Sequence, residues 1–157
     1  MTTPKTLISI EEYCASDSVG YLLSRSRAKL ARALDVALAE HDITHTQGGI
    51  LMMLAKGKCA LASELSRELY IDSASMTRMV DRLEKRDLIV RCPSADDRRV
   101  STLQLTQDGK ALAKKLPTIY VKVLNQSFAG FSQNEMDTLK GLLGKFLYKD
   151  NDGTHNE

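Results

Sequence analysis

The stretch that decides the fold is residues 71–92, which read IDSASMTRMVDRLEKRDLIVRC. Its first half repeats apolar residues at the spacing of an amphipathic helix. These apolar positions are Met76, Val80 and Leu83. Asp72 or Ser73 is the expected N-cap of that helix. From Leu88 onward, apolar residues alternate with others, which is the period of a β-strand. The stretch therefore predicts a short helix followed at once by a strand.

The sequence on either side extends this pattern. Leu103 and Leu105 alternate with polar residues, and a charged, turn-forming segment, 93–99, separates them from the first strand. The two strands are therefore expected to form a β-hairpin with an exposed tip. Upstream, leucines at positions 61, 65 and 69 predict another brief helix that ends near Tyr70. Two short helices joined by a tight turn and followed by a charged hairpin are typical of a winged helix-turn-helix.

The outer parts of the chain are expected to be helical. A long helix begins near Val19 and ends at residues 42–44, and a short apolar helix ends at residues 56–58, where Gly57 can cap it. Thr106 can cap a further helix, which Pro117 is expected to kink or interrupt. Ser132, with Glu135 three residues later, predicts the start of the last helix. The predicted fold class is mainly α with a small β-hairpin wing.

Composition excludes several classes of protein. The 157 residues, 43% of them hydrophobic and 27% charged, suit one globular domain, and the longest uncharged apolar run, Gly48–Ala55, is too short to span a bilayer. The N-terminus lacks the features of a signal peptide, so we expect a cytoplasmic protein. Three cysteines without C-x-x-C spacing argue against disulfides and zinc, and we expect no cofactor or metal. The sequence also lacks a G-x-S-x-G, a phosphate-binding glycine loop and an H-E-x-x-H, so an enzyme is not expected.

The net charge of +2 does not by itself indicate nucleic acid, but the type of cation changes along the chain. Seven of the eight basic residues between positions 60 and 106 are Arg, whereas all seven between 107 and 157 are Lys. The planar guanidinium group of Arg suits recognition of phosphate and guanine. The predicted winged segment therefore carries the cations that suit DNA.

The predicted helix at 73–85 offers a polar outer face for DNA. In a helix-turn-helix the second helix enters the major groove with its N-terminal residues toward the bases. Small hydroxyl side chains let the backbone approach DNA, and Arg78 suits guanine. At the hairpin tip, Arg98 and Arg99 suit the minor groove, and Asp97 is expected to hold one of these arginines in place. The candidate DNA contacts are Ser73, Ser75, Thr77, Arg78, Arg82, Asp97, Arg98 and Arg99.

Other interpretations of these residues remain open. The serines at 73 and 75 can serve only as a helix cap. Arg82, Lys85 and Arg86 can form a solvated helix face that pairs with acidic neighbours at positions 81, 84 and 87. The apolar stripes of the first and last helices can be simple core, but a module this small would leave both partly uncovered, so a partner subunit is expected.

The run at 71–89, the Asp97-Arg98-Arg99 segment and the run Leu105-Thr106-Gln107-Asp108-Gly109 resemble the MarR family of bacterial transcription regulators. The resemblance covers about residues 16–148. It implies a homodimer with an intertwined helical dimerisation domain and two winged lobes that bind double-stranded DNA at a pseudo-palindromic operator. It also implies that residues 73–82 are the recognition helix and that Asp97 and Arg99 form the Asp-x-Arg of the wing.

The resemblance also implies a domain organisation and an activity. Residues 1–15 would be an N-terminal extension, 16–42 and 107–148 dimerisation helices, 45–106 the winged helix-turn-helix, and 149–157 a flexible tail. Most members of the family repress transcription and release DNA when a small, frequently aromatic and anionic, ligand binds. A repressor released by an aromatic carboxylate is therefore expected.

An effector pocket is expected between the two parts of the domain. Polar residues there suit a carboxylate or hydroxyl: Ser24, Arg27, His41, His45, Gln47 and Gly48. Where the family often has a bulky aromatic residue, this chain has Gly48 and Gly49, which imply either a roomier pocket or a looser helix start. The histidines can also serve as helix caps.

A cysteine-based redox switch of the same fold is the alternative function. The peroxide-sensing branch of the family carries a reactive Cys near the start of the first helix, at a position that matches Gly20 in this chain. Cys14 lies six residues upstream of it. Cys59 and Cys92 are expected to be buried and inert.

Overall fold

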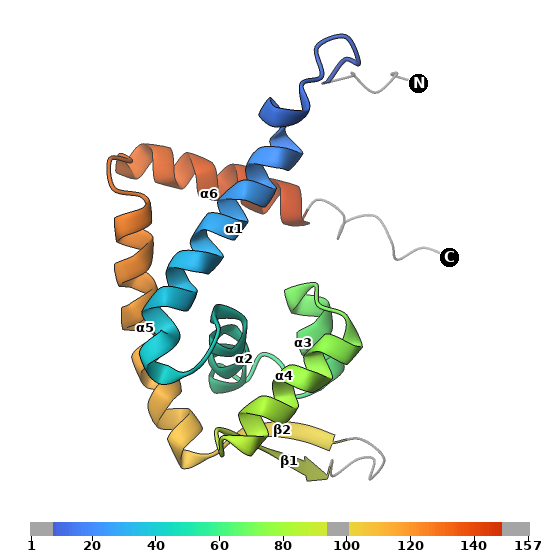
Figure 1. The fold of residues 1–157 in the computed structure, drawn as a ribbon, viewed down its shortest axis with the longest axis vertical. Helices are drawn as coiled ribbons and strands as arrows, with labels where there is room; N and C mark the ends of the chain where they lie inside the picture. The colour runs from blue at the N-terminus through green and yellow to red at the C-terminus, as the bar shows by residue number, and fades with distance from the viewer. Residues whose placement is uncertain (1–7, 94–100, 149–157) are drawn as a thin grey trace. The chain divides into compact units, whose positions relative to one another are not determined.

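The computed structural model describes residues 8–93 and 101–148. Figure 1 shows a mainly helical chain with a two-stranded antiparallel sheet. The elements are α1 (Val19–Leu38), α2 (His45–Ala55), α3 (Ala62–Leu69), α4 (Ser73–Lys85), β1 (Ile89–Pro93), β2 (Ser101–Leu105), α5 (Gln107–Ser127) and α6 (Gln133–Tyr148), with short 3-10 turns at Ala15–Asp17 and Ala39–His41. This order confirms the predicted fold class. The predicted wing tip, with Asp97, Arg98 and Arg99, and the predicted tail lie outside the described residues.

The chain divides into two compact units, Met1–Leu124 and Asn125–Glu157. The first unit contains α1 to α4, the sheet and most of α5, and the second contains the end of α5 and all of α6. This division differs from the one that the sequence suggests, with a winged part at 45–106 between dimerisation helices. The division suggested by the sequence describes the roles of the segments in a dimer, and it stays a prediction.

The helix-turn-helix forms because two local signals coincide. Helix α3 ends at Tyr70, whose positive φ of 52° stops the helix. Two residues later, the Asp72 carboxylate accepts a hydrogen bond of 2.8 Å from the backbone N–H of Ser75 and starts α4. Asp72 is thus the N-cap, one of the two residues predicted for this role.

The core of the first unit lies where α2, α3, α4, the sheet and α5 meet. The three apolar residues predicted for the inner face of α4 are all fully buried. Around them, side chains from every neighbouring element are also fully buried, which fixes how the elements pack. These include Leu38, Ile50, Leu51, Leu65, Ile89 and Leu116.

The pairing of the strands places Ile89 on the buried face of the hairpin and leaves Val90 exposed. Ile89 lies opposite Leu105, and Arg91 lies opposite Leu103. Ile89 and Leu103 are buried. In addition, the N–H of Leu103 donates a 2.7 Å hydrogen bond to the carbonyl of Ala60, in the connection between α2 and α3. The hairpin is therefore tied to the helices by backbone as well as by side chains.

The junction between β2 and α5 is closely packed. The Thr106 hydroxyl accepts a 3.0 Å hydrogen bond from the N–H of Gly109, which confirms Thr106 as a cap of α5, and donates one of 2.6 Å to the carbonyl of Asp87. A Cβ atom at Gly109 would lie 1.9 Å from the carbonyl oxygen of Leu88. Only glycine fits there without a shift of the backbone.

Helix α2 begins earlier than its apolar run suggests. Thr44 and Gln47 form a capping box: the Thr44 hydroxyl accepts from the N–H of Gln47, and the Gln47 side chain accepts from the N–H of Thr44. The helix therefore starts at His45. Its end agrees with the sequence, because Gly57 has a φ of +64° and follows the last turn.

Pro117 does not interrupt α5, contrary to one of the two expectations for it. The helix is continuous from Gln107 to Ser127. Leu116 and Val123 are buried on either side of the proline. Burial of the same apolar face on both sides offsets the hydrogen bond that proline cannot donate.

The second unit consists of the end of α5, a turn and α6. Gly130, at φ +95°, lies in the turn, and the rings of Phe128 and Phe131 pack edge to face with centroids 5.3 Å apart. The Ser132–Glu135 capping box starts α6 as predicted. Among the described residues of α6, none is buried. No helix in residues 8–93 and 101–148 is long and apolar enough to cross a membrane.

Candidate nucleic-acid interface

Helix α4 presents a polar outer face of small hydroxyl and basic side chains. Four of the predicted contacts on this helix are exposed, namely Ser73, Thr77, Arg78 and Arg82, while Ser75 is half-buried. The Thr77 hydroxyl donates a 2.9 Å hydrogen bond to the carbonyl of Ser73, and Nη2 of Arg78 donates one of 2.9 Å to Oγ of Ser75. The Arg78 guanidinium is thus held beside the first turn of the helix. Its other N–H groups remain available to donate hydrogen bonds to a bound molecule.

The start of α4 carries a fixed negative charge. The hydrogen bond from the Ser75 N–H is the main cause of the lowered pKa of the Asp72 carboxyl. Asp72 therefore stays ionised at neutral pH and holds the first turn, where free N–H groups point outward. The Asp72 carboxylate thus fixes the geometry of the helix start, while contacts to phosphate are left to the hydroxyl and basic side chains of α4.

Arg91 joins the hairpin to α4. From β1, its guanidinium donates to the carboxylates of Asp81, at 2.6 Å, and Glu84, both on α4. The hydrogen bond to Asp81 is the main cause that raises the pKa of Arg91. Because the two carboxylates come from one helix and the cation from the strand, this contact fixes the hairpin against the candidate recognition helix.

Sequence reasoning missed this ion-pair cluster. The sequence suggested only that Arg82, Lys85 and Arg86 can pair with acidic neighbours at positions 81, 84 and 87. That alternative is wrong for Asp81 and Glu84, which bind Arg91. The available signal was the spacing of two acidic residues three positions apart on the helix, followed by one arginine within an alternating apolar strand.

Arg86 has another structural role. Its guanidinium donates to the backbone carbonyls of His41, at 3.0 Å, and of Asp42. These carbonyls lie in the turn between α1 and α2, where Asp42 has a φ of 51°. Arg86 therefore joins the end of α4 to the end of α1, and is not part of a free solvated face.

Replacement of Arg91 by methionine is expected to lower the free energy of unfolding by about 1 kcal/mol, because three partly exposed charges lose their contacts. The apolar stem of the side chain is kept, so the strand should still pack. We expect affinity for DNA to fall as well, since the hairpin is no longer fixed to α4. Urea unfolding and a gel-shift titration measure the two effects.

Arg82→Met provides the matched control, because it removes the same charge from an exposed position on α4. We expect this variant to lose DNA affinity with an unchanged free energy of unfolding. Equal unfolding midpoints for Arg91→Met and the unmodified protein would contradict a structural role for the cluster.

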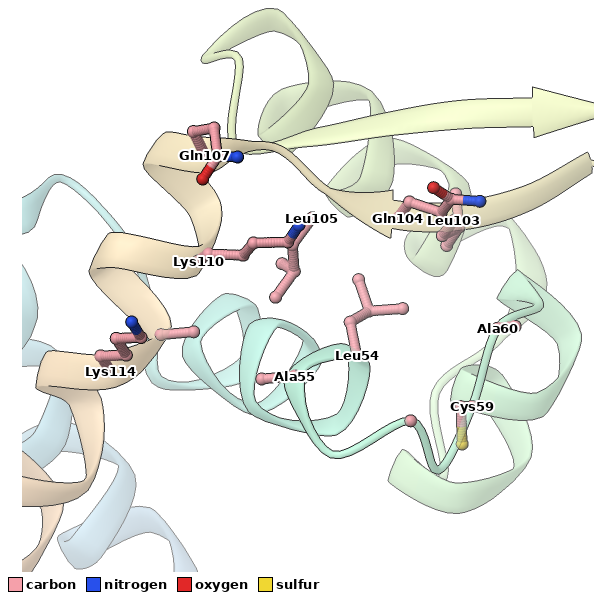
Figure 2. Close-up of a pocket in the computed structure, with 12 residues that line it drawn as sticks. Leu54, Ala55, Cys59, Ala60, Leu103, Gln104, Leu105, Gln107, Lys110 and Lys114 are labelled. Carbon is pink, nitrogen blue, oxygen red and sulfur yellow. The ribbon is translucent and has the colours of Figure 1, made fainter.

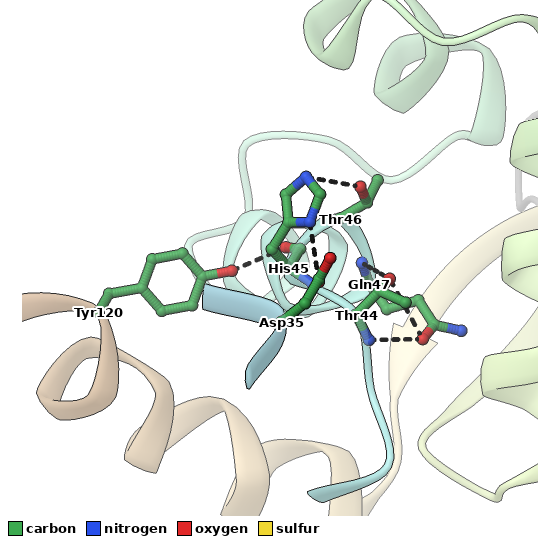
Figure 3. Close-up of polar contacts among 6 residues, drawn as sticks. All are labelled: Asp35, Thr44, His45, Thr46, Gln47 and Tyr120. Atoms are coloured by element: carbon green, nitrogen blue, oxygen red, sulfur yellow. Dashed lines mark hydrogen bonds and ion pairs between the residues drawn. The ribbon is translucent and has the colours of Figure 1, made fainter. Parts of the chain in front are cut away.

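A second polar cluster joins α1, α2 and α5 (Figure 3). The Asp35 carboxylate accepts a 2.6 Å hydrogen bond from the backbone N–H of His45 and contacts Nδ1 of its ring at 2.9 Å. Burial opposes ionisation of Asp35, but these hydrogen bonds outweigh it and lower its pKa. From α5, the Tyr120 hydroxyl donates a 2.7 Å hydrogen bond to the carbonyl of His45. The first turn of α2 is therefore held from two sides.

Gly48 makes room for the Tyr120 hydroxyl. A Cβ atom at position 48 would lie 2.8 Å from Oη of Tyr120, but 3.6 Å from its Cε2. Neither explanation considered for the glycine pair, a roomier ligand pocket or a looser helix start, describes this position. The space beside Gly48 is occupied by a tyrosine, and the helix start is held by a capping box.

We expect the substitutions Gly48→Ala and Tyr120→Phe to be non-additive. Each alone should destabilise the fold, by about 1–2 kcal/mol for the crowded methyl group and about 1 kcal/mol for the lost hydrogen bond. In the double variant the oxygen that the methyl group would meet is absent, so the total loss should be smaller than the sum. Chemical denaturation of the four proteins measures this coupling.

Gly49→Ala is the control, because a Cβ there meets only Leu69, at an ordinary 3.9 Å. It should be neutral or slightly stabilising. Strict additivity of the Gly48 and Tyr120 substitutions would contradict the proposed contact.

The raised pKa of Tyr120 leads us to expect a change in the free energy of unfolding at high pH. Burial raises the pKa of its hydroxyl from 10 to about 12. A group whose pKa is higher in the folded state stabilises the fold below its unfolded pKa, and this contribution is lost as pH rises between about 10 and 12. Compared with Tyr120→Phe, the unmodified protein should therefore lose more stability in this interval, which pH-dependent urea unfolding can measure.

The residues predicted for an effector pocket do not meet in the described part of the first unit. His45, Gln47 and Gly48 lie together at the start of α2 in structural roles, and Gln47 is buried. Ser24 and Arg27 are exposed and precede Asp35, the α1 residue that contacts His45, by eleven and eight residues, about 16 and 12 Å along a helix. His41 is half-buried, and its carbonyl accepts from Arg86. A pocket that includes all six stays a prediction.

The three cysteines have different environments. Cys14 is exposed, and a hydrogen bond with the Ser16 hydroxyl, 3.3 Å from its Sγ, is the main cause of a lowered thiol pKa. Cys59 and Cys92 are half-buried, and burial raises the pKa of Cys59. Cys14 is therefore the more reactive of the two thiols with a shifted pKa. Within the described ranges, no group of three or more His, Cys, Asp or Glu side chains could hold a metal ion.

Known proteins with a similar sequence or fold are transcription regulators. The model of the MarR family matches residues 43–101, which include α2 to β1 and the start of β2. The transcriptional regulator SarZ of Staphylococcus aureus is 28% identical over 143 residues, which cover 91% of this chain and 95% of SarZ.

Solved structures give the same result. A mutant form of Escherichia coli MarR complexed with operator DNA is 28% identical, with a TM-score of 0.76 over 82% of this chain and 93% of that one. Bordetella bronchiseptica BpsR, whose DNA binding is regulated by 6-hydroxynicotinic acid, shares the fold at 24% identity, with a TM-score of 0.75 over 85% of this chain and 96% of BpsR. With its helix-turn-helix, hairpin and matching relatives, the chain is similar to the MarR family of transcription regulators.

Proposed function

We propose that this protein is a homodimeric repressor that binds a pseudo-palindromic operator and is released from it by a small aromatic acid. The observation that carries the proposal is the outer face of α4, where exposed Ser73, Thr77 and Arg78 lie on a capped helix next to the β1–β2 hairpin. Such a helix fits the major groove, and hydroxyl and guanidinium groups recognise phosphates and base edges.

The wing completes the proposed interface. Asp97, Arg98 and Arg99 belong to the segment that joins β1 to β2. We propose that Arg99 enters the minor groove and that Asp97 holds the wing arginines, as in the Asp-x-Arg segment of the family. Ser75 and Arg82 complete the set of proposed DNA contacts from α4.

Exposed apolar side chains support a dimer. On α1, Val19 and Leu22 are exposed, and on α6, Leu142 and Phe146 are exposed by 62% and 68%. Apolar surface of this extent is typical of an interface with another chain. A two-fold dimer places its recognition helices about 34 Å apart, so the operator should contain inverted half-sites about 10 base pairs apart.

A gel-shift titration with the promoter DNA that flanks the gene tests the proposal. We expect binding that weakens steeply with salt and is released by one member of a panel of aromatic acids, such as salicylate, p-coumarate and 6-hydroxynicotinate. Sedimentation equilibrium should give the mass of a dimer. Absence of a shift at low salt would mean that this winged helix is not used for DNA binding.

A redox-sensing repressor is the second candidate, and the exposed Cys14 with its lowered thiol pKa favours it. A thiol becomes more reactive toward peroxide as its thiolate form becomes more populated. In this case peroxide would release the operator from the unmodified protein but not from Cys14→Ser. Release by an aromatic acid, with no response to peroxide, would support the first candidate over the second.

A further inference from the structure

The turn between α3 and α4 carries a strongly exposed aromatic side chain. Tyr70 is 86% exposed, more than any other aromatic residue in the described ranges 8–93 and 101–148. Its neighbours on either side, Leu69 and Ile71, are partly buried against the core of the first unit. The turn is therefore anchored by the residues that flank Tyr70, and the fold makes little use of the tyrosine ring itself.

The backbone at Tyr70 has a conformation that is costly for tyrosine. Its φ of 52° lies in the left-handed region, where helices usually end on glycine or asparagine because a Cβ atom is crowded there. The N–H of Tyr70 donates to the carbonyl of Arg67 at 3.4 Å, and that of Ile71 to the carbonyl of Ser66 at 3.0 Å. These hydrogen bonds fix the direction of the tyrosine side chain. Strained conformations are concentrated at functional sites, so an exposed tyrosine here indicates a binding role.

Tyr70 does not line the cavity of the first unit. This cavity, of about 620 Å³, lies between the end of α2, the connection from α2 to α3, β2 and the first turns of α5 (Figure 2). On the connection its lining residues are Gly57, Cys59 and Ala60, which precede α3, whereas Tyr70 caps the opposite end of that helix. The role of Tyr70 is therefore not explained by a molecule in this cavity.

Tyr70 lies instead beside the proposed DNA-binding face. It comes two residues before Asp72, the N-cap of α4, and three before the exposed Ser73 (Figure 1). In a helix-turn-helix the second helix enters the major groove, while the first crosses the sugar–phosphate backbone. The residue that ends the first helix and leads into the second is therefore expected where the groove meets the backbone.

A neutral phenol suits a phosphate at this place. The tyrosine hydroxyl donates one hydrogen bond and carries no charge at neutral pH. A lysine or arginine at position 70 could pair with the ionised Asp72 carboxylate, which holds the first turn of α4 through the N–H of Ser75. The phenol leaves this cap intact and still offers a donor to an anion.

We propose that the Tyr70 hydroxyl donates a hydrogen bond to a phosphate oxygen of DNA, at the edge of the groove that α4 enters. Such a contact positions the protein on the duplex without reading its sequence, because every nucleotide presents the same phosphate group. The proposal rests on the proposed DNA-binding function and adds to it a contact from outside α4 and the wing.

Gel-shift titrations of Tyr70→Phe test this contact, with the promoter DNA that flanks the gene and with an unrelated duplex of the same length. We expect the affinity for both duplexes to fall about fivefold, through loss of one hydrogen bond. The salt slope should not change, because a neutral hydroxyl releases no counterion. Arg82→Met, which removes a cation from α4, should instead lower this slope.

Tyr13→Phe is the matched control, because Tyr13 is also exposed, at 59%, and precedes α1. Its affinity for both duplexes should equal that of the unmodified protein. Neither substitution should change the urea midpoint, since both hydroxyls face water. Tyr70→Gly gives a second criterion: it relieves the left-handed conformation, so its midpoint should not fall, whereas its affinity for DNA should.

Fluorine NMR of protein labelled with 3-fluorotyrosine reports on the ring directly. The chain has five tyrosines, and the signal that is missing from Tyr70→Phe belongs to Tyr70. Promoter DNA should shift this signal. The Tyr13 signal, assigned in the same way from Tyr13→Phe, should stay in place.

The outcomes separate this inference from the proposed function. If the unmodified protein binds neither duplex, both are wrong. If it binds promoter DNA but Tyr70→Phe binds equally well, or the Tyr70 fluorine signal does not respond to DNA, the phosphate contact is wrong and the proposed function stands. A loss of affinity confined to the promoter duplex would also overturn the inference, because it would indicate contact with a base.

Discussion

Gly109→Ala is expected to lower the free energy of unfolding by about 3 kcal/mol or more. The added Cβ would lie 1.9 Å from the backbone oxygen of Leu88 and 2.9 Å from its carbonyl carbon. The obstacle is main chain, so relief requires α5 to move away from the residue that precedes β1. That movement would also strain the hydrogen bonds of Thr106 to Asp87 and Gly109. Urea unfolding at fixed protein concentration measures the loss.

Gly49→Ala again serves as the control, because it adds the same methyl group to a helix where nothing lies closer than 3.9 Å. We expect its unfolding midpoint to match or slightly exceed that of the unmodified protein. A Gly109→Ala protein with an unchanged midpoint would show that α5 and the residue before β1 separate at little cost. The close approach also gives a physical reason for the Leu105-Thr106-Gln107-Asp108-Gly109 run on which the family resemblance partly rests.

Local signals explain why much of the fold was predictable. The Asp72 cap, the apolar residues of α4 and the change to a period of two at Leu88 each act within a few residues, and the structure follows all of them. The Ser132–Glu135 capping box is of the same kind. Pro117 is the instructive exception: its local preference was overridden because apolar residues on both sides of it are buried.

Contacts between distant segments could not be predicted. The hydroxyl of Tyr120 reaches a carbonyl 75 positions earlier, and Arg86 reaches carbonyls 44 and 45 positions earlier. No periodicity or spacing predicts such pairs. For this reason the sequence suggests for Gly48 only a roomier pocket or a looser helix start, and not the contact with Tyr120. The exposed face of α4 needed only the helical period, so Ser73, Thr77, Arg78 and Arg82 were placed correctly on the surface, whereas Ser75 is half-buried.

Charge reversal at Arg78, Arg98 and Arg99 is expected to abolish the proposed operator binding and leave the proposed dimer and the unfolding midpoint intact. Each arginine that contacts a base or a phosphate contributes about 1–3 kcal/mol, and a glutamate at the same place adds repulsion. Loss of three contacts should therefore weaken binding by more than about a thousandfold. Arg78 is exposed, and its hydrogen bond is to Ser75 alone among the described residues, so the fold does not require it.

The control reverses a similar charge away from the proposed interface, at Lys115 and Lys122 on the exposed side of α5. These substitutions should reduce affinity only modestly, through the overall field of the protein. The salt dependence gives a second criterion, because fewer phosphate contacts release fewer counterions. If the arginine variant kept both its affinity and its salt slope, α4 and the wing would not be the DNA-binding surface. If it lost the dimer as well, the arginines would have a structural role that the exposed position of Arg78 does not suggest.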